Sequence, residues 1–255
     1  NIALREALKT EPAFDYVLLL NPDAWPRDGA LKTLADFLAA TPLAGVVGPR
    51  LEHEDGVMQA SGFRFFSGWG EFDWCAGPGF TWAMLGGGAG IPPQPDEPAP
   101  FDWLSGAALL FRREVFESVG LFDETYFLYY EETDLMRRAR RAGWRAFRVP
   151  AARIVHLQGK SVEAAGGPRV SPESWYRSRR YYFRKNHGAL YAFVADIAWL
   201  AGAGWYWLRL KFSGQPAAES ARAIGRFVKS QFGGGLGPPP AEKQPAGGGV
   251  RVSPD

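Results

Sequence analysis

The chain has 255 residues, of which 46% are apolar and 22% charged, so its composition is that of a globular protein and excludes wholesale disorder. Its formal net charge of +2 is too small to indicate a nucleic-acid partner by itself. The single cysteine, Cys75, excludes an internal disulfide and a cysteine-rich metal site, so we expect a reducing compartment such as the cytoplasm.

The first part of the chain alternates helical and strand patterns. Residues 2–9 have helical spacing, and YVLLL (16–20) is an apolar run typical of a strand buried on both faces. A second helix is predicted within residues 26–42, followed by another buried strand, AGVVGPRL (44–51). Strand, crossover helix and strand in this order favour a parallel sheet, so we predict an α/β fold.

The middle of the chain loses this periodicity and then regains it. Residues 64–100 mix glycine, proline and aromatic residues over a length that is unusual for a plain connection. A strand is predicted within FDWLSGAALLFRR (101–113), then a short helix (113–120) and a longer one (130–143) that ends at glycine. One or two short strands follow in RAFRVPAARIVHLQGKS (145–161).

The composition changes again in the last third. An arginine-rich helix is predicted around residues 175–185, an aromatic apolar segment over 189–208 and an amphipathic helix over 219–232. The remaining residues are too rich in glycine and proline to pack. We therefore expect an α/β domain over residues 1–165, a helical region over 166–232 and a disordered tail over 233–255.

Two oxygen-bearing side chains follow the first predicted strand. Asn21 and Asp23 come after YVLLL, and ligands of open parallel sheets bind beyond the carboxyl ends of strands. A carboxylate and an amide oxygen suit Mg²⁺ or Mn²⁺, which take their other ligands from water and a diphosphate. The alternative is that Asn-Pro-Asp only forms a turn, with Asp23 near a helix start.

Three carboxylates crowd into the first turn of the helix predicted after FLYY. Glu131, Glu132 and Asp134 repel one another, which should raise the pKa of at least one and favour a general base near neutral pH. The alternative is structural, because acids at a helix start followed by the basic run RRARR complement the helix dipole.

A lone histidine, His156, ends the last predicted strand. Such a residue is more often hydrogen-bonded within the structure than a ligand. It shares its strand-end position with Asp23, however, so we expect Asp23, the acidic helix start and His156 to converge on one rim of the sheet.

These motifs follow one another in an order that resembles a known family. The run WLSGAALLFRREVFESVGLFDETYFLYYEETDLMRRARRAGWRAFRVPAARIVHLQGKS is similar to the nucleotide-sugar glycosyltransferases of family 2, especially bacterial rhamnosyltransferase-like members. The resemblance covers about residues 1–190. It implies a GT-A fold, with a mostly parallel sheet flanked by helices, and an inverting mechanism with a carboxylate base and a metal-binding Asp-x-Asp-type motif.

The resemblance also implies roles for individual residues. Asp23 matches the last acid of the metal-binding motif, whereas Asn21 replaces its first acid and leaves the expected Mg²⁺ or Mn²⁺ site with less charge. Glu132 matches the catalytic base, one methylene longer than the aspartate of many members, and His156 matches a histidine that completes the metal site in some. The positions implied to contact donor or acceptor are Asn21, Trp103, Ser105, Gly106, Asp123, Glu131 and Asp134.

The resemblance implies that elements which family members have at their start come before residue 1. Those members begin with a strand rich in valine and isoleucine, a helix, and a second strand whose acid contacts the nucleotide base. NIALREAL resembles the helix that comes next. We therefore expect the chain to be N-terminally incomplete, with much of the nucleoside pocket missing.

The C-terminal region combines basic and apolar segments. Residues 169–185 hold six basic residues and one acid, which could form an RNA-binding face, although a site for a diphosphate or an anionic lipid is favoured. The segment 189–208 could span a bilayer, but its central Asp196 would cost about 2.5 to 3.5 kcal/mol. We predict an interfacial helix, with a buried helix as the alternative. Its anchors would be Trp199, Trp205 and Trp207.

The expected function is inverting transfer of a sugar from a nucleoside-diphosphate donor to a hydroxyl group of a glycan or a polyprenyl-diphosphate-linked acceptor. This would serve cell-surface polysaccharide synthesis at the inner face of the membrane, with peripheral membrane contact and no nucleic-acid partner. The alternative is a non-catalytic, degenerate module that binds acceptor or a membrane complex. A hydrolase is a weaker third interpretation, because its two carboxylates would flank a cleft instead of sharing one helix turn.

Overall fold

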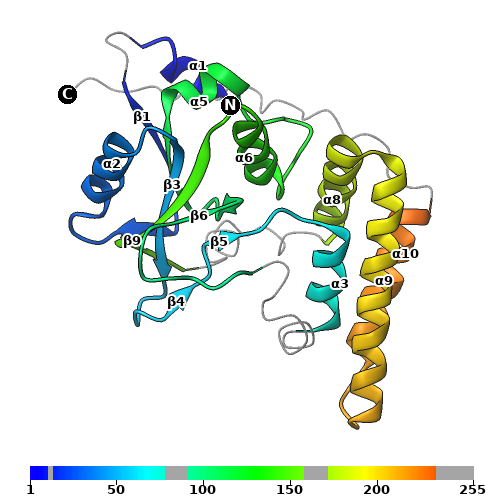
Figure 1. Ribbon diagram of the computed structural model, residues 1–255. Helices are drawn as coiled ribbons and strands as arrows, with labels where there is room; N and C mark the ends of the chain where they lie inside the picture. The colour runs from blue at the N-terminus through cyan, green and yellow to red at the C-terminus, as the bar shows by residue number, and fades with distance from the viewer. Residues whose placement is uncertain (11–13, 78–90, 158–171, 234–255) are drawn as a thin grey trace, which may run out of the picture.

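The computed structural model describes the chain except residues 11–13, 78–90, 158–171 and 234–255. The described residues form a mixed sheet flanked by helices, beside which stands a layer of further helices (Figure 1). The strands are β1 (Tyr16–Leu20), β2 (Ala24–Pro26), β3 (Ala44–Glu52), β4 (Met58–Gln59), β5 (Gly62–Phe63), β6 (Ala99–Phe101), β7 (Trp103–Leu104), β8 (Ala108–Arg112) and β9 (Arg145–His156). The helices are α1 (Ile2–Ala7), α2 (Ala30–Ala40), α3 (Gly68–Ala76), α5 (Arg113–Val119), α6 (Glu131–Arg141), α8 (Pro172–His187), α9 (Ala189–Phe212) and α10 (Ala218–Phe232).

The main sheet has the strand order β1-β8-β3-β9-β2, with β4 beside β3 and β6 beside β9. Strands β3 and β9 pair in parallel, whereas β8 runs antiparallel between β1 and β3. Strands β1, β3 and β9 therefore run in one direction. The predicted α/β fold is confirmed, and the sheet is mixed because β8 and the short strands enter it antiparallel.

The core lies on both faces of the sheet. On one face α2 packs against alternate strand residues such as Val47 and Leu110. On the other face α1, α5 and α6 pack against their neighbours Val46 and Leu109. Successive side chains of a strand point to opposite faces, so a strand covered on both sides needs the near-continuous apolar run that β3 has.

The first strand does not have the position predicted for it. YVLLL was expected to be buried on both faces, but β1 lies at the edge of the sheet and pairs with β8 alone among the described strands. Its residues are partly exposed, and Leu20 is 39% exposed. An apolar run shows only that a strand can be buried, and the position of the strand in the sheet decides whether it is.

Two elements carry no clear signal in the sequence. Helix α3 lies within the segment predicted to be irregular, and its N-cap Ser67 accepts a hydrogen bond from the Gly70 N–H at 3.1 Å. The short strand β2 ends at Pro26 and lies at the sheet edge opposite β1, where a missing N–H group is tolerated. The predicted short strands after residue 144 form one strand of 12 residues, β9.

Helices α3, α8, α9 and α10 form the layer beside the sheet, here called the helical layer (Figure 1). The three C-terminal helices occupy the predicted segments. Helix α3 packs closely on α9, because a Cβ atom at Gly202 would lie 2.4 Å from the Phe72 carbonyl oxygen. The expected domain boundary at residue 165 and nearly all of the expected tail, 233–255, lie outside the described residues.

A buried ion cluster holds the helical layer together. The fully buried Arg179 of α8 pairs through Nε with Glu71 Oε2 at 2.7 Å, and through Nη1 with Asp196 Oδ1. Asp196, which was expected to oppose membrane insertion, thus lies inside the protein. The prediction that Trp199 is an exposed anchor is wrong, since its ring is buried and stacks on Phe227 at 3.9 Å. In the described part of the chain no helix is long and apolar enough to cross a bilayer.

Candidate active site

The short strand β2 brings Asp23 to His156. Ala24 pairs with His156 in the β2–β9 register, and the Asp23 carbonyl oxygen accepts a hydrogen bond from the Leu157 N–H at 3.0 Å. His156 Nε2 lies 3.6 Å from Asp23 Oδ1. These two side chains therefore meet at the carboxyl end of β9, on the rim where the sequence indicated a site.

The Asp23 carboxylate is poised for a cation. It is 8% exposed, and neither oxygen has a hydrogen-bond partner among the described residues. A buried carboxylate without partners is costly, and a bound cation would remove that cost. No group of three or more His, Cys, Asp or Glu side chains in the described ranges is arranged to hold a metal ion, so a cation here would also need water or diphosphate oxygens.

His156 is held in the form that can bind a metal. Burial lowers its pKa, and the neighbouring Asp23 only partly opposes this shift, so the imidazole is neutral near pH 7. Its Nδ1 lies 3.3 Å from Gln59 Oε1, which can only accept a hydrogen bond. The proton therefore sits on Nδ1, and the Nε2 lone pair faces Asp23.

Gln59 is a site residue that sequence reasoning missed. Its Nε2 donates to the His156 carbonyl oxygen at 2.7 Å and lies 3.0 Å from His53 Nδ1. Gln59 reaches this place because β4, only two residues long, pairs with the end of β3. So short a strand has no periodicity, and no signal in the sequence could have found it.

Glu132 stands at the start of α6 in an environment that favours its protonated form. Burial, followed by repulsion from Glu131, raises the pKa of Glu132 to about 8, although backbone N–H groups including those of Thr133 and Gly106 oppose the shift. Its Oε2 is buried without a hydrogen-bond partner in the described structure. Burial raises the pKa of Glu131 as well. The predicted general base therefore has a pKa close to the working range of such groups.

A turn between β7 and β8 connects Glu132 with the end of β1. The Gly106 N–H hydrogen-bonds to the Glu132 carboxylate, and the next residue, Ala107, accepts a hydrogen bond from the Asn21 N–H at 2.9 Å. The Asn21 carbonyl oxygen accepts in turn from the Ala24 N–H at 3.1 Å, beside Asp23. The predicted base and the predicted metal ligands are thus linked through one run of backbone contacts.

The residues before Glu131 adopt an uncommon backbone conformation. Tyr129 and Tyr130 have φ angles of 67° and 71°, the only positive values outside glycine in the described chain. Such conformations cost energy and persist where the surroundings fix them. Here Ser178 of α8 donates a hydrogen bond to the Leu128 carbonyl oxygen at 2.8 Å, and the buried Tyr130 ring contacts Phe66 at a centroid distance of 4.5 Å.

Asp123 and Asp134 point toward α8. Asp134 is fully buried and binds Lys185 Nζ at 2.8 Å and Arg138 Nε at 3.0 Å. Asp123 binds the same Lys185 Nζ at 2.8 Å and accepts from the Tyr181 hydroxyl at 2.9 Å. Although burial opposes the shift, these contacts lower the pKa of both carboxyls. Asp123 ties α8 to the chain before α6, and Asp134 ties α8 to α6 itself. A role of either acid in binding substrate stays a prediction.

Trp103 and Ser105 flank the same turn. Trp103 stacks on Phe63 at 4.4 Å, and its indole Nε1 donates to the Arg64 carbonyl oxygen at 2.8 Å. The Ser105 N–H donates to the Ser61 carbonyl oxygen at 2.9 Å. These contacts make Trp103 and Ser105 part of the support for Gly106, and their contact with donor or acceptor stays a prediction.

Known proteins include relatives that are similar to this chain in sequence. The chain is 31% identical over 202 residues to an N-acetylglucosaminyl-diphospho-decaprenol L-rhamnosyltransferase of Mycobacterium tuberculosis, covering 78% of this chain and 60% of that protein. It is 25% identical over 141 residues to the low-salt glycan biosynthesis hexosyltransferase Agl10 of Haloferax volcanii, covering 55% and 41% of the two chains. The chain thus spans about three fifths of the length of the mycobacterial relative.

A solved structure and a family model add to these matches. A crystal structure of GalNAc-T7 with UDP, GalNAc and Mn²⁺ aligns with a TM-score of 0.47 and 14% identity over 91% of this chain and 42% of that one, a likeness too low to support a conclusion. The model of the glycosyltransferase like family 2 matches residues 2–169. Because this match covers well over half of the sequence, the chain belongs to glycosyltransferase family 2.

Proposed function

We propose that the protein transfers a sugar, with inversion, from a nucleoside-diphosphate donor to a hydroxyl group of a lipid-linked glycan acceptor. The observation that carries this proposal is that the side chains of Glu132 and Asp23 are linked through backbone hydrogen bonds at one rim of the sheet. Glu132 has a pKa raised to about 8, and the turn at Gly106 and Ala107 connects it with Asn21 and hence with Asp23. An inverting transfer needs a base for the acceptor hydroxyl and a positive charge beside the leaving diphosphate, and Asp23 is an anionic ligand for a cation that would supply this charge.

Glu132 supplies the base in this mechanism. Its ionised carboxylate accepts the proton of the acceptor hydroxyl as the acceptor oxygen bonds to the anomeric carbon of the sugar. The bond from that carbon to the diphosphate breaks on the opposite face, and the diphosphate leaves with the bonding electron pair. Because Glu132 Oε2 has no partner among the described residues, it is available for the acceptor hydroxyl.

Asp23 and His156 would hold a divalent cation, Mg²⁺ or Mn²⁺. When bound, such a cation stabilises the negative charge that develops on the leaving diphosphate. The carboxylate of Asp23 and the Nε2 lone pair of His156 would be its protein ligands, and Gln59 would keep the histidine ring in this orientation. Because Asn21 brings no second charge, oxygens of the diphosphate would have to complete the set of ligands.

The exposed face of α9 supports a lipid-linked acceptor, because it carries apolar side chains that could contact a membrane. Apolar side chains recur on this helix at spacings of three, four and seven residues, and Leu190 and Phe212 are 80% and 89% exposed. The exposed members are Leu190, Phe193, Val194, Ile197, Trp205, Leu208 and Phe212. We propose that this face lies on the inner side of the membrane, and the name of the mycobacterial relative, which includes a diphospho-decaprenol-linked substrate, supports a lipid-linked acceptor.

A groove in the helical layer would receive the lipid part of the acceptor. It has a volume of about 730 Å³, and its walls include Trp74, Trp175 and Trp199. Trp175 also contacts the ring of Tyr130 at a centroid distance of 6.2 Å, directly before Glu131. A prenyl chain in this groove would therefore bring its diphosphate-linked sugar toward the acids of α6.

Membrane contact is tested by flotation with vesicles of phosphatidylethanolamine and phosphatidylglycerol. We expect the protein to float with the vesicles, and the double variant Phe193→Ser/Phe212→Ser to remain in solution. Leu43→Ser, which alters an apolar residue that is 63% exposed and far from α9 in the sequence, is the control and should still float. Equal flotation of the double variant, or none of the unaltered protein, would rule out this surface.

Transfer is tested by a screen of nucleotide sugars with a prenyl-diphosphate-linked sugar acceptor, with and without Mn²⁺. We expect release of nucleoside diphosphate in step with a glycosylated acceptor whose new anomeric centre is inverted, as read by NMR. The alternative is a degenerate module that only binds acceptor. It is supported by Asn21, which stands where the metal-binding motif of the family has its first acid. It predicts acceptor binding without nucleoside diphosphate release, so one assay separates the two functions.

A further inference from the structure

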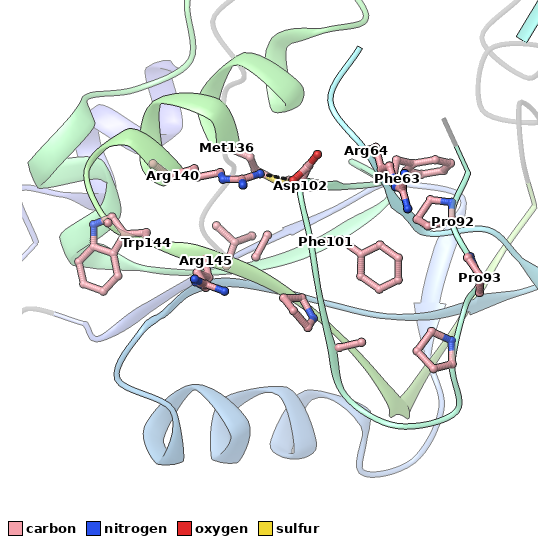
Figure 2. A pocket seen from close by; sticks show the side chains of 17 residues that line it. Phe63, Arg64, Pro92, Pro93, Phe101, Asp102, Met136, Arg140, Trp144 and Arg145 are labelled. Carbon is pink, nitrogen blue, oxygen red and sulfur yellow. Dashed lines mark hydrogen bonds and ion pairs between the residues drawn. The ribbon is translucent and has the colours of Figure 1, made fainter. Parts of the chain in front are cut away.

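Polar side chains from distant parts of the chain meet at β4. The pocket shown in Figure 2, with a volume of about 670 Å³, has Arg64 and Arg145 on opposite sides, so these two charges do not converge on one ligand. At β4, by contrast, Gln59 contacts both His53 and His156. These three side chains come from the end of β3, from β4 and from the end of β9, and they meet beside the proposed cation site.

The turn between β3 and β4 holds His53 in place. The His53 N–H donates to the Val57 carbonyl oxygen at 2.9 Å, and the His53 carbonyl oxygen accepts from the Gly56 N–H at 3.0 Å. The Asp55 carboxylate accepts from the Val57 N–H at 3.0 Å, and Gly56 has a φ angle of 83°, which glycine adopts at little cost. The backbone of His53 is therefore fixed by hydrogen bonds at both its N–H and its carbonyl group.

The carboxamide group of Gln59 fits its neighbours in one orientation. The His156 carbonyl oxygen can only accept a hydrogen bond, so the amide nitrogen of Gln59 faces it, at 2.7 Å. The same nitrogen has a second hydrogen for His53 Nδ1, which lies 3.0 Å away. The amide oxygen lies 3.3 Å from His156 Nδ1 and accepts its proton. His53 therefore accepts through Nδ1 and carries its own proton on Nε2 when its ring is neutral.

His53 satisfies a hydrogen bond that would otherwise be lost in the interior. Gln59 is 6% exposed, so without His53 one amide N–H of Gln59 would be buried with no acceptor. This is costly, so Gln59 would turn toward water and give up its contact with His156 Nδ1. The proton of His156 could then sit on either ring nitrogen, and a proton on Nε2 would occupy the lone pair that faces Asp23.

We propose that His53 is a positioning residue, which acts through Gln59 to keep the Nε2 lone pair of His156 directed at Asp23. The inference rests on the proposed function, because this lone pair serves the reaction only if Asp23 and His156 hold a cation. A histidine that binds a metal is usually oriented by a hydrogen bond from its other ring nitrogen, as Gln59 provides here. His53 extends this support by one residue, from the turn between β3 and β4.

NMR of the metal-free protein labelled with ¹⁵N-histidine tests this role, because the ring nitrogen shifts report which nitrogen carries the proton. The chain has three histidines, so their signals can be assigned from single variants. At about pH 8, above the usual histidine pKa of about 6.5, we expect the His156 proton on Nδ1 and the His53 proton on Nε2.

Variants of His53 separate positioning from a general effect on the fold. In His53→Leu, which has no acceptor, the His156 signals should shift toward the form with its proton on Nε2. His53→Asn should restore the Nδ1 form, because its side-chain oxygen can accept from Gln59. His187→Leu, which removes a histidine at the end of α8, is the matched control and should leave the His156 signals unchanged.

Mn²⁺ affinity, measured by calorimetry, connects this role with the proposed cation site. His53→Leu should weaken Mn²⁺ binding about threefold to tenfold, which is less than the loss expected when the direct partner of a ligating histidine is removed. In the Gln59→Leu background the same change should have no further effect, because His53 acts only through Gln59. His53→Asn should keep the affinity of the unaltered protein.

Two results would overturn the proposal. One is an unchanged position of the His156 proton in His53→Leu, and the other is an equal loss of Mn²⁺ affinity from His53→Leu with and without Gln59. A failure of the unaltered protein to bind Mn²⁺ would instead contradict the proposed cation site, and the position of the His156 proton would still decide whether His53 orients this ring. Neither measurement uses a sugar donor or an acceptor, so both are independent of transfer.

Discussion

Replacing Arg179 would leave two carboxylates buried without their partner. Arg179 has no exposed surface, and it binds Glu71 at 2.7 Å and also pairs with Asp196. Removing one member of a buried ion pair costs about 3 to 5 kcal/mol, because the remaining charge stays out of water. Methionine keeps the aliphatic part of the side chain but ends before the guanidinium group that lies over Phe183 and Phe227, so some packing is lost together with the charge.

Urea denaturation measures this loss as the free energy of unfolding. Arg179→Met should lower it by about 3 kcal/mol or more, whereas Arg222→Met, an exposed arginine paired with an exposed Glu219, should leave it unchanged. A loss below about 1 kcal/mol for Arg179→Met would refute the reasoning, because it would mean that water reaches these carboxylates.

The pH dependence identifies the cause of the loss. Burial raises the pKa of Glu71, and Arg179 opposes this shift, so in Arg179→Met the folded-state pKa of Glu71 lies higher still. A carboxyl with a raised folded pKa binds more protons in the folded state, so its stability contribution is lost as pH rises. The deficit of Arg179→Met should therefore be smallest near pH 5 and grow toward pH 8, and Glu71→Gln in that background should reduce it.

Two further predictions concern the site itself. Only ionised Glu132 can act as a base, and its pKa is raised to about 8, so kcat/KM should rise with pH through about 8. Glu131→Gln removes the repulsion from Glu131 and should move the midpoint of this rise to lower pH. A profile that is flat between pH 6 and 9 would contradict this prediction. Gln59→Leu should weaken Mn²⁺ binding, measured by calorimetry, about 10- to 100-fold, because His156 loses its orienting hydrogen bond. Gln215→Leu, which changes an exposed glutamine, should leave the affinity unchanged. An unchanged affinity in Gln59→Leu would exclude the orienting role.

The sequence predicted most reliably what depends on local pattern. The near-continuous apolar run of residues 44–51 forms β3, and acids followed by basic residues form α6, because both patterns are set by neighbours along the chain. Asp23 and His156 were also expected to meet, from their strand-end positions. The N-cap of α6 is Tyr130, which has a positive φ and makes no capping hydrogen bond through its side chain, and no local sequence pattern predicts this helix start.

The remaining features depend on contacts between distant residues. Strand β2 exists because it pairs with β9, more than 120 residues later, and Gln59 reaches His156 through a two-residue strand. The sequence showed three acids at the start of α6 but could not show that Asp134 would turn to Lys185. Likewise the apolar spacing of α9 could not show that Trp199 faces Phe227. Such contacts arise only when separate elements pack.

The central claim is that Glu132 is the base of a sugar transfer, and Glu132→Gln tests it most directly. The variant keeps the size of the side chain, so kcat should fall about 100- to 10,000-fold while donor binding, measured by calorimetry, changes little. Glu117→Gln, an exposed change on α5, is the matched control and should retain full kcat. Near-normal kcat in Glu132→Gln would contradict the account.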